Sequence, residues 1–159
     1  MSVNVRRVDD VDAKASADRA FVQSLGRRCA TTSVASMRPA SEATVREAFD
    51  RLCEIIEMQS HVTLIAERDG ERVGFLLLLD ELPDEVTLSP QGFIAYMAVE
   101  PDTRRAGIGT ALLAAAEDEA RRRGVAYMAL MVTEENDAAR HLYQHRGYVT
   151  ERRLLCKAL

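Results

Sequence analysis

The chain has 159 residues, of which 47% are hydrophobic, so we expect a single domain over residues 1–159 with a buried core. Its formal net charge of −4 argues against a nucleic-acid partner, which would require a basic face to neutralise phosphates. Residues 1–10 contain no signal-peptide segment, and the longest apolar run, Phe75–Leu79, is far below the ~20 residues of a membrane helix, so we expect a cytoplasmic protein with no membrane partner.

The first part of the chain is predicted to form one strand and two helices. The predicted elements are a strand over Val3–Val8, a helix from Asp9 to about Arg28, a loop over Ala30–Ala40, and a second helix that ends near Gln59. Ser41 is the expected N-cap of this second helix, because the apolar residues behind it follow helical spacing.

Three strands follow, and the first two are expected to form a hairpin. Val62–Glu67 and Arg72–Leu79 are apolar, and the Asp69-Gly70 pair between them is a strong signal for a tight turn. An acidic loop over Asp80–Gln91 then leads to a strand over Gly92–Val99.

The last part of the chain alternates helices and strands. One face of a helix is marked by apolar residues at every fourth position: Ile108, Leu112, Ala116 and Ala120. The elements predicted after it are a strand over Val125–Val132, a helix capped by Asn136 and closed by Gly147, and a final strand over Tyr148–Cys156. This order predicts a mixed sheet flanked by helices, that is, an α+β sandwich.

The strongest functional signal is the loop between the strand that ends at Val99 and the following helix. A helix N-terminus leaves backbone N–H groups unpaired and carries partial positive charge, so a phosphate can accept from several of them at once. Gly107 and Gly109 lack a Cβ and allow close approach of an anion, while Arg104 and Arg105 add cationic donors. We therefore predict that this loop, Arg104–Gly109, binds a pyrophosphate.

Two other kinds of phosphate loop do not match this sequence. A Walker loop requires a lysine after its last glycine, where this chain has Thr110, and a dinucleotide fingerprint requires a glycine where it has Leu112. Two glycines at this spacing, taken alone, are more typical of an ordinary helix start.

In its context, Arg104-Arg105-Ala106-Gly107-Ile108-Gly109 resembles the [Gln/Arg]-x-x-Gly-x-[Gly/Ala] motif of the GNAT superfamily of N-acetyltransferases. The resemblance implies a GNAT-like fold, with a mixed, mostly antiparallel sheet, and acetyl-CoA as co-substrate. It also implies that the loop holds the coenzyme A pyrophosphate, while a bulge in the preceding strand lets the backbone accept the pantetheine arm. The cofactor-binding residues expected on this basis are Met97, Val99, Arg104, Arg105, Ala106, Gly107, Ile108, Gly109, Thr110 and Asn136.

A second segment, from Asn136 to Tyr148, matches the same superfamily. It resembles the Asn-x-x-Ala-x-x-Leu-Tyr-x-x-x-Gly-[Phe/Tyr] pattern and follows the first motif in the expected order. The resemblance implies that Tyr143 is the catalytic general acid, which protonates the coenzyme A thiolate, and that Asn136 lies near the cofactor arm. A phenol with a pKa near ~10 suits that proton transfer. Core packing and N-capping are equally ordinary roles for these two residues.

The sequence does not identify the general base. Many members of the superfamily place a glutamate near the start of the strand that leads into the loop, but Gly92–Tyr96 contains no acid. Water relayed to Glu100, Glu134, Tyr96 or a loop carboxylate would serve instead. The missing glutamate also motivates an alternative function, a coenzyme A or acyl-CoA binding module without transfer activity.

Other candidate residues are expected to have ordinary structural roles. His141 and His145 have the spacing of two metal ligands, but no third ligand is evident, so we expect no metal site. The three cysteines form no Cys-x-x-Cys pair, which indicates neither a disulfide framework nor a zinc knuckle. The acidic residues between Asp80 and Glu85 are expected to form a solvated loop.

The sequence therefore predicts an enzyme that transfers an acetyl group from acetyl-CoA to a primary amine by direct attack. The acceptor, a small molecule or a peptide, is expected to be shaped by the first two helices and their connection, about Asp9 to Gln59. Formation of a homodimer is compatible with such a fold.

Overall fold

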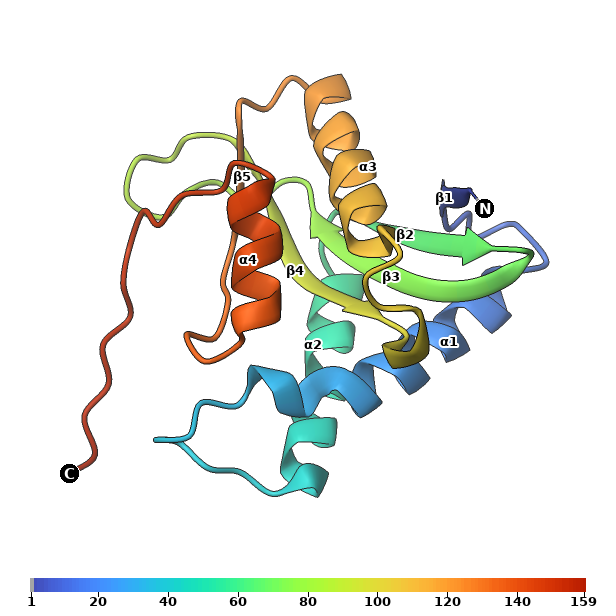
Figure 1. The fold of residues 1–159 in the computed structure, drawn as a ribbon. Coiled ribbons are helices and arrows are strands. Elements are labelled where there is room, and N and C mark those ends of the chain that lie inside the picture. The colour runs from blue at the N-terminus through green and yellow to red at the C-terminus, as the bar shows by residue number, and fades with distance from the viewer. Residues whose placement is uncertain (1) are drawn as a thin grey trace.

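The computed structural model describes residues 2–159 and shows a five-stranded sheet with helices on both faces (Figure 1). The strands are β1 (Val3–Arg7), β2 (His61–Arg68), β3 (Glu71–Leu79), β4 (Gln91–Val99) and β5 (Tyr127–Leu130). The helices are α1 (Ala15–Cys29), α2 (Glu42–Glu57), α3 (Ile108–Arg122) and α4 (Asp137–His145), with short 3-10 helices η1 (Ala30–Ser33) and η2 (Pro101–Thr103). The sheet order is β1-β2-β3-β4-β5, antiparallel except for the parallel β4–β5 pair. The predicted α+β class with a mixed, mostly antiparallel sheet is confirmed.

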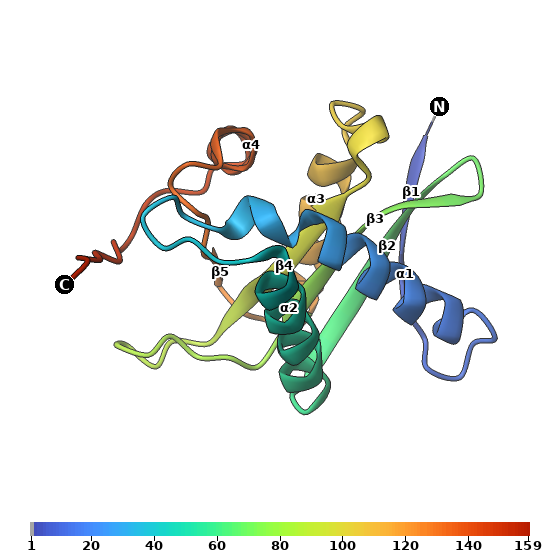
Figure 2. The ribbon, with the colours of Figure 1, turned by 90° about the horizontal axis from the view of Figure 1, so that it is seen from below.

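Helices cover both faces of the sheet (Figure 2), and each face carries its own apolar layer. On the α1/α2 face, the ring of Phe75 lies 6.4 Å from that of Phe49 and 6.0 Å from that of Tyr96, measured between centroids. On the α3/α4 face, the stripe predicted for α3 is confirmed, because Ile108, Leu112, Ala116 and Ala120 are all buried. None of the helices in residues 2–159 has the length and apolar character that a membrane crossing requires.

β4 carries a β-bulge at Ala95, close to its middle. Leu77 of β3 pairs with Tyr96, whereas the next residue, Leu78, pairs with Ile94, so one residue of β4 is left without a partner on β3. The bulge that the family resemblance implies is therefore present.

Several local signals in the sequence are confirmed. The Thr44 N–H donates to Ser41 Oγ at 3.1 Å, so Ser41 caps α2 as predicted. Asp69 and Gly70 both have left-handed φ values, +54° and +81°, as a two-residue turn between antiparallel strands requires. β5 is present but shorter than predicted at both ends.

The helix predicted from Asp9 begins later, at Ala15. Ahead of it, Asp9 Oδ1 accepts a hydrogen bond from the Val11 N–H at 3.1 Å, and Asp12 Oδ1 accepts from the Lys14 N–H at 2.9 Å. Aspartate side chains that bind nearby backbone N–H groups in this way compete with helix formation. The prediction was therefore wrong for residues 9–14, which form turns.

The final strand predicted over Tyr148–Cys156 is absent. Residues 149–159 have no secondary structure and extend away from the sheet (Figure 1). Arg152 in this segment donates a hydrogen bond at 2.5 Å to Asp84, in the loop between β3 and β4. The prediction was wrong because a strand needs a neighbouring backbone to pair with as well as a suitable sequence, and no strand among residues 2–159 pairs with this segment.

The buried carboxylate of Asp18 links α1 to β1 and β3 by hydrogen bonds. Asp18 of α1 is 1% exposed, and its two oxygens accept hydrogen bonds from Arg6 of β1 at 2.8 Å and from Arg72 of β3 at 2.7 Å. Arg6 also donates to Glu67 of β2 at 2.8 Å. The Arg6 hydrogen bond, aided by Arg72 and opposed by burial, lowers the pKa of the Asp18 carboxyl group.

Candidate active site

The loop between β4 and α3 has an irregular backbone that is fixed at its helical end. Arg105 and Gly107 both have left-handed φ values, +68° and +76°, on either side of Ala106. A positive φ is uncommon for arginine and persists where the surrounding structure enforces it. Ile108, only 1% exposed, packs into the core and anchors the first turn of α3. The side chains of Arg104 and Arg105 remain exposed beside this turn.

The backbone N–H groups at the start of α3 are free to bind a ligand. α2 and α4 begin at Ser41 and Asn136, whose side chains each accept a helix N–H, whereas α3 begins at Gly107 and has no side-chain cap. Within the described chain, no protein acceptor binds the N–H groups of residues 105–110. An exposed helix start of this kind attracts an anion. The donors that the predicted pyrophosphate site requires are therefore available.

The two glycines of this loop are needed for different reasons. At Gly107 a Cβ would meet nothing within 4 Å, so glycine is favoured there by its left-handed φ. At Gly109 a Cβ would lie 2.8 Å from Leu142 Cδ2 of α4 and 3.8 Å from Met97 Cε of β4. The second glycine therefore lets α3, α4 and β4 approach closely, a packing role that the sequence motif did not indicate.

β4 presents a free backbone edge next to this loop. Its parallel pairing with β5 runs from Gln91 opposite Tyr127 to Ile94 opposite Leu130, and it stops at the bulge. Over Tyr96–Val99, β3 is the one strand among residues 2–159 that pairs with β4. An extended ligand can add to an edge of this kind as a strand would. The stretch contains the two β4 residues that the family resemblance assigned to the cofactor.

Tyr143 and Asn136 are both on α4, which packs beside this edge. Tyr143 is partly buried in the same apolar cluster as Met97 and Val99. Burial raises the pKa of its hydroxyl group, so Tyr143 is protonated at neutral pH and can donate. Asn136 Oδ1 accepts a hydrogen bond from the Ala139 N–H at 3.3 Å and caps α4. Both ordinary roles considered for these residues, core packing and capping, are observed, and neither prevents a role in catalysis.

The connection between α1 and α2 is bonded to the connection between β5 and α4. Thr133 Oγ1 donates to the Ser33 carbonyl oxygen at 2.7 Å. The N–H and the Oγ of Ser36 both lie 3.0 Å from Glu135 Oε1, which accepts from them. Because residues 133 and 135 lie just before the cap of α4, these bonds hold the segment expected to shape the acceptor next to the start of α4.

The candidate general bases lie in different environments. Burial raises the pKa of Tyr96 to about 12, opposed by its hydrogen bond with Ser33, so Tyr96 is unsuited to accept a proton at neutral pH. The carboxylate of Glu100 accepts a hydrogen bond from Arg28 at 2.7 Å. The side chain of Glu134 is 89% exposed. A carboxylate, acting directly or through water, is thus the better candidate.

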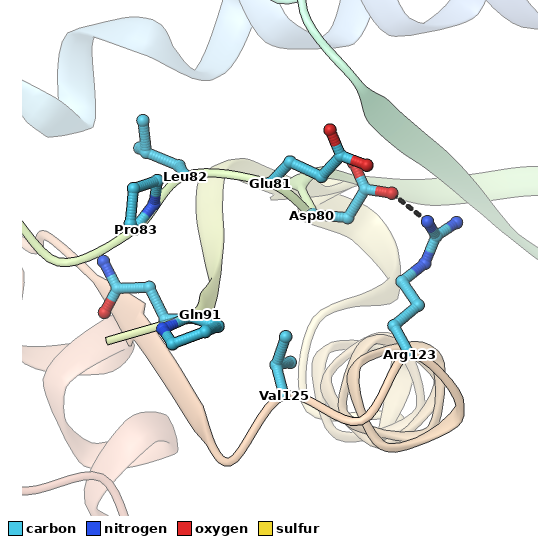
Figure 3. Close-up of a pocket in the computed structure, with 8 residues that line it drawn as sticks. Asp80, Glu81, Leu82, Pro83, Gln91, Arg123 and Val125 are labelled. Atoms are coloured by element: carbon cyan, nitrogen blue, oxygen red, sulfur yellow. Dashed lines mark ion pairs between the residues drawn. The ribbon is translucent and has the colours of Figure 1, made fainter. Parts of the chain in front are cut away.

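The acidic loop after β3 was expected to be solvated, but two of its carboxylates, Asp80 and Asp84, are buried. Asp80 is ion-paired with Arg123 at a hollow of about 500 Å³, which Gln91 and Val125 also line (Figure 3). Its Oδ1 atom is buried with no hydrogen-bond partner among residues 2–159. The hollow lies where β4 begins and α3 ends, roughly 20 Å along α3 from the loop described above, so it is not part of the candidate site.

A protein-family model described as "Acetyltransferase (GNAT) family" matches residues 30–148. The chain belongs to this family. It is therefore an acyl-CoA-dependent acetyltransferase, with acetyl-CoA as its co-substrate.

Two curated relatives show how far the sequence similarity of this acetyltransferase extends. The uncharacterized N-acetyltransferase YhfO of Bacillus subtilis (strain 168) is 35% identical over 111 residues, which make up 70% of this chain and 72% of the relative. The mycothiol acetyltransferase of Thermobispora bispora is 36% identical over 84 residues, which make up 53% of this chain but only 28% of that protein.

Solved structures of low sequence identity share the fold of this acetyltransferase. A Pyrococcus furiosus protein named as a candidate acetyl transferase has a TM-score of 0.80 at 23% identity, over 99% of this chain and 100% of that one. Aminoglycoside N-acetyltransferase AAC(6')-Iy, solved in complex with CoA, has a TM-score of 0.68 at 20% identity, over 98% of both chains.

The structure adds residues near the site that the motifs did not indicate. The Cys29 thiol is buried next to the Arg104 side chain, and burial raises its pKa despite the arginine. Arg28 binds Glu100 where the loop begins. Arg28 and Cys29 lie at the end of α1, far from the motifs in sequence. Only the packing of α1 on β4 brings them close to the loop between β4 and α3.

Proposed function

We propose that this acetyltransferase moves the acetyl group of acetyl-CoA to a primary amine, which attacks the thioester directly. The observation that carries the proposal is the meeting of three features at one place. These are the free N–H groups of residues 105–110, the free edge of β4 beyond its bulge, and Tyr143 of α4. Family membership supports acetyl transfer, and the CoA complex of a protein with the same fold supports the cofactor.

Acetyl-CoA, when bound, supplies the acetyl group as a reactive thioester. The N–H groups from Arg105 to Thr110 bind its pyrophosphate, with Arg104 and Arg105 balancing the negative charge. The backbone of Met97 and Val99 orients the extended arm along β4. Residues from a helix start, a strand edge and α4 therefore hold one ligand in one orientation.

Tyr143 gives a proton to the thiolate that leaves, and the proton that the attacking amine loses passes to a carboxylate, directly or through water. Its raised pKa keeps the hydroxyl group protonated until negative charge develops beside it. Asn136 Oδ1 is occupied by the cap of α4, which leaves the amide nitrogen of Asn136 for the cofactor arm.

The acceptor is proposed to be a primary amine on a small molecule or a peptide. It approaches along the bonded pair of connections at Ser33–Ser36 and Thr133–Glu135, which flank α4. The acceptor class is supported by similarity to N-acetyltransferases, among them an aminoglycoside enzyme of the same fold.

A calorimetric titration with acetyl-CoA, comparing the wild type with Gly107→Glu, tests the pyrophosphate assignment. The new side chain has room, since nothing lies within 4 Å of a Cβ at this position, but it places a negative charge beside the anion. Two unit charges ~5 Å apart at an effective dielectric constant of about 20 repel by ~3 kcal/mol, which corresponds to roughly a hundredfold in Kd.

Gly70→Glu is the matched control for this titration. Gly70 also has a left-handed φ, +81°, and open space around it, but it lies in the turn between β2 and β3. The control is expected to show a comparable loss of stability and unchanged acetyl-CoA affinity. Equal affinity for acetyl-CoA in the wild type and Gly107→Glu would refute the assignment, as would a wild type that fails to bind millimolar acetyl-CoA.

A further inference from the structure

The hollow between the end of β3 and the end of α3 has the size and the lining of a ligand site. Its volume of about 500 Å³ falls within the range of roughly 300–1,000 Å³ that small-molecule sites occupy. Three charged residues, Asp80, Glu81 and Arg123, lie on one side of it, and Leu82 and Pro83 lie on the other (Figure 3). The lining is completed by Pro90, Gln91 and Val125. The hollow therefore offers charge on one side and apolar surface on the other.

The charged side of the hollow is negative. Two carboxylates and one guanidinium line it, so one negative charge is left over. Arg123 is also shared with a residue outside the hollow, because its Nε lies 3.6 Å from Oε2 of the buried Glu119. Glu81 is exposed and forms no ion pair with any of residues 2–159. A wall of this kind attracts a cationic ligand.

Asp80 has a free acceptor atom at this wall. Its side chain is 2% exposed, and its ion pair with Arg123 uses Oδ2. The other oxygen, Oδ1, has no hydrogen-bond partner among residues 2–159. A buried carboxylate oxygen without a donor costs free energy, which a donor group on a ligand would recover. Since Asp80 lines the hollow, the ligand that fits carries positive charge and donates hydrogen bonds.

We propose that this hollow is a second binding site and takes a small alkylammonium ion. The ammonium group donates to Asp80 Oδ1 and to the Glu81 carboxylate after a small rotation of these side chains, while Arg123 remains on Oδ2. The alkyl chain packs on Leu82 and Pro83. The proposal does not depend on the acetyl transfer proposed above, because the hollow lies roughly 20 Å along α3 from the loop at its start.

Two other kinds of cation fit this hollow less well. A guanidinium group binds a carboxylate best through both oxygens, and Asp80 has one oxygen left beside Arg123. A metal ion requires several ligands, and residues 2–159 contain no group of three or more His, Cys, Asp or Glu side chains that could hold one. An ammonium group is a compact donor, which suits one buried oxygen and one exposed carboxylate.

The amide chemical shifts of the ¹⁵N-labelled full chain test the site. Butylamine at pH 7, where its ammonium form prevails, is expected to shift the signals of residues 80–82 and 123–125 saturably. 1-Butanol, an uncharged molecule of similar shape, is expected to leave these signals in place. Methylamine is expected to bind roughly tenfold more weakly than butylamine, because it lacks three CH₂ groups that are partly buried on the apolar side.

Three variants test the part played by the carboxylates. Asp80→Asn keeps the shape of the side chain and is expected to weaken butylamine binding by ~10-fold or more. Glu81→Gln is expected to weaken it by about fivefold, the effect of one charge in water-like surroundings. Glu85→Gln is the matched control, because it removes an exposed charge from the same loop outside the hollow, and its butylamine affinity should be unchanged. Since Glu81 is exposed, Glu81→Gln decides the question even if Asp80→Asn does not fold.

Several results would overturn the alkylammonium site. These are the absence of any saturable shift with butylamine, equal shifts with 1-butanol, and an unchanged butylamine affinity in Glu81→Gln. Calcium chloride that shifts the same signals in place of butylamine would make the hollow a metal site instead. Shifts confined to residues 33–36 and 133–135 would place the amine at the connections proposed for the acceptor, which would overturn the second site and leave the proposed function standing.

Discussion

Tyr96 and Tyr143 lie on opposite faces of the sheet near the bulge of β4, and burial raises the pKa of both hydroxyl groups. At neutral pH both are hydrogen-bond donors and neither is a base. Their positions separate their roles, because Tyr96 packs among the rings of the α1/α2 layer, whereas Tyr143 shares a cluster with the free stretch of β4. We therefore propose Tyr143, and not Tyr96, as the donor of the proton to a leaving thiolate.

Tyr143→Phe removes the hydroxyl group that would donate this proton and keeps the aromatic ring. We expect kcat for acetyl transfer to fall by roughly 10²-fold or more, the usual contribution of a positioned general acid, with acetyl-CoA affinity nearly unchanged. Steady-state kinetics with an amine substrate and calorimetry measure the two quantities.

Tyr148→Phe is the control for Tyr143→Phe. The ring of Tyr148 lies 5.8 Å from that of Tyr143, but its hydroxyl group is paired with Glu117 at 3.5 Å. The control variant should keep most of the activity. A Tyr143→Phe enzyme with wild-type kcat would remove the hydroxyl group from the mechanism.

Helix packing decides the outcome of a substitution that helix propensity alone would favour. Gly26 lies inside α1, and alanine in its place normally stabilises a helix by about 1 kcal/mol. Here a Cβ would lie 1.9 Å from Cζ of Phe49 on α2. Gly26→Ala is therefore expected to lower the free energy of unfolding by about 1–3 kcal/mol, as measured by urea titration.

Phe49→Leu in the same protein tests whether this contact is the cause. The shorter side chain should relieve the overlap, so the double variant should lose less stability than the sum of the two single variants. Additive losses would show that the contact with Phe49 is not the cause, and a stabilising Gly26→Ala would show that α1 and α2 separate at no cost.

Elements were predictable from sequence where the signal is local. The cap at Ser41, the Asp69-Gly70 turn and the stripe of α3 depend on neighbours in sequence, and all three were correct. The predictions that were wrong concern elements that depend on residues distant in sequence, or on side chains that compete for backbone N–H groups. The Tyr148–Cys156 strand lacks a paired backbone, and Asp80 and Asp84 are buried by partners elsewhere in the chain. The same holds for the candidate site. The loop motif indicated the backbone N–H donors, which are local, but not the contact of Gly109 with Leu142, which is distant in sequence.

On the scale of the whole molecule, acid stability depends on the ionised Asp18 that joins β1, α1 and β3. The pKa of Asp18 is lowered in the folded state, while an unfolded aspartate titrates near ~3.9. Its contribution is therefore complete above about pH 4 and is lost as the pH falls through the lower folded-state pKa, because the unfolded chain binds the proton first.

Asp18→Asn is expected to lower the free energy of unfolding by roughly 3 kcal/mol at pH 7, because Arg6 and Arg72 lose a buried anionic partner. The difference between variant and wild type should shrink as the pH is lowered towards 3. Denaturant titrations at several pH values measure it. Asp118→Asn, which breaks an exposed ion pair with Arg121, should cost less than about 1 kcal/mol. A constant difference from pH 7 to pH 3 would contradict the assignment.

The one unpaired residue at Ala95 sets which layer every later side chain of β4 belongs to. Because successive side chains of a strand point to opposite faces, Ala95 and Tyr96 could not both face the α1/α2 layer in a regular strand. A β4 of the same sequence that kept the pairing of Ile94 but paired regularly through Ala95 would turn Tyr96 towards α4 and Met97 towards Phe49. The bulge, as much as the identity of the residues between Gly92 and Val99, therefore determines which side chains of β4 border the proposed acetyl-CoA site.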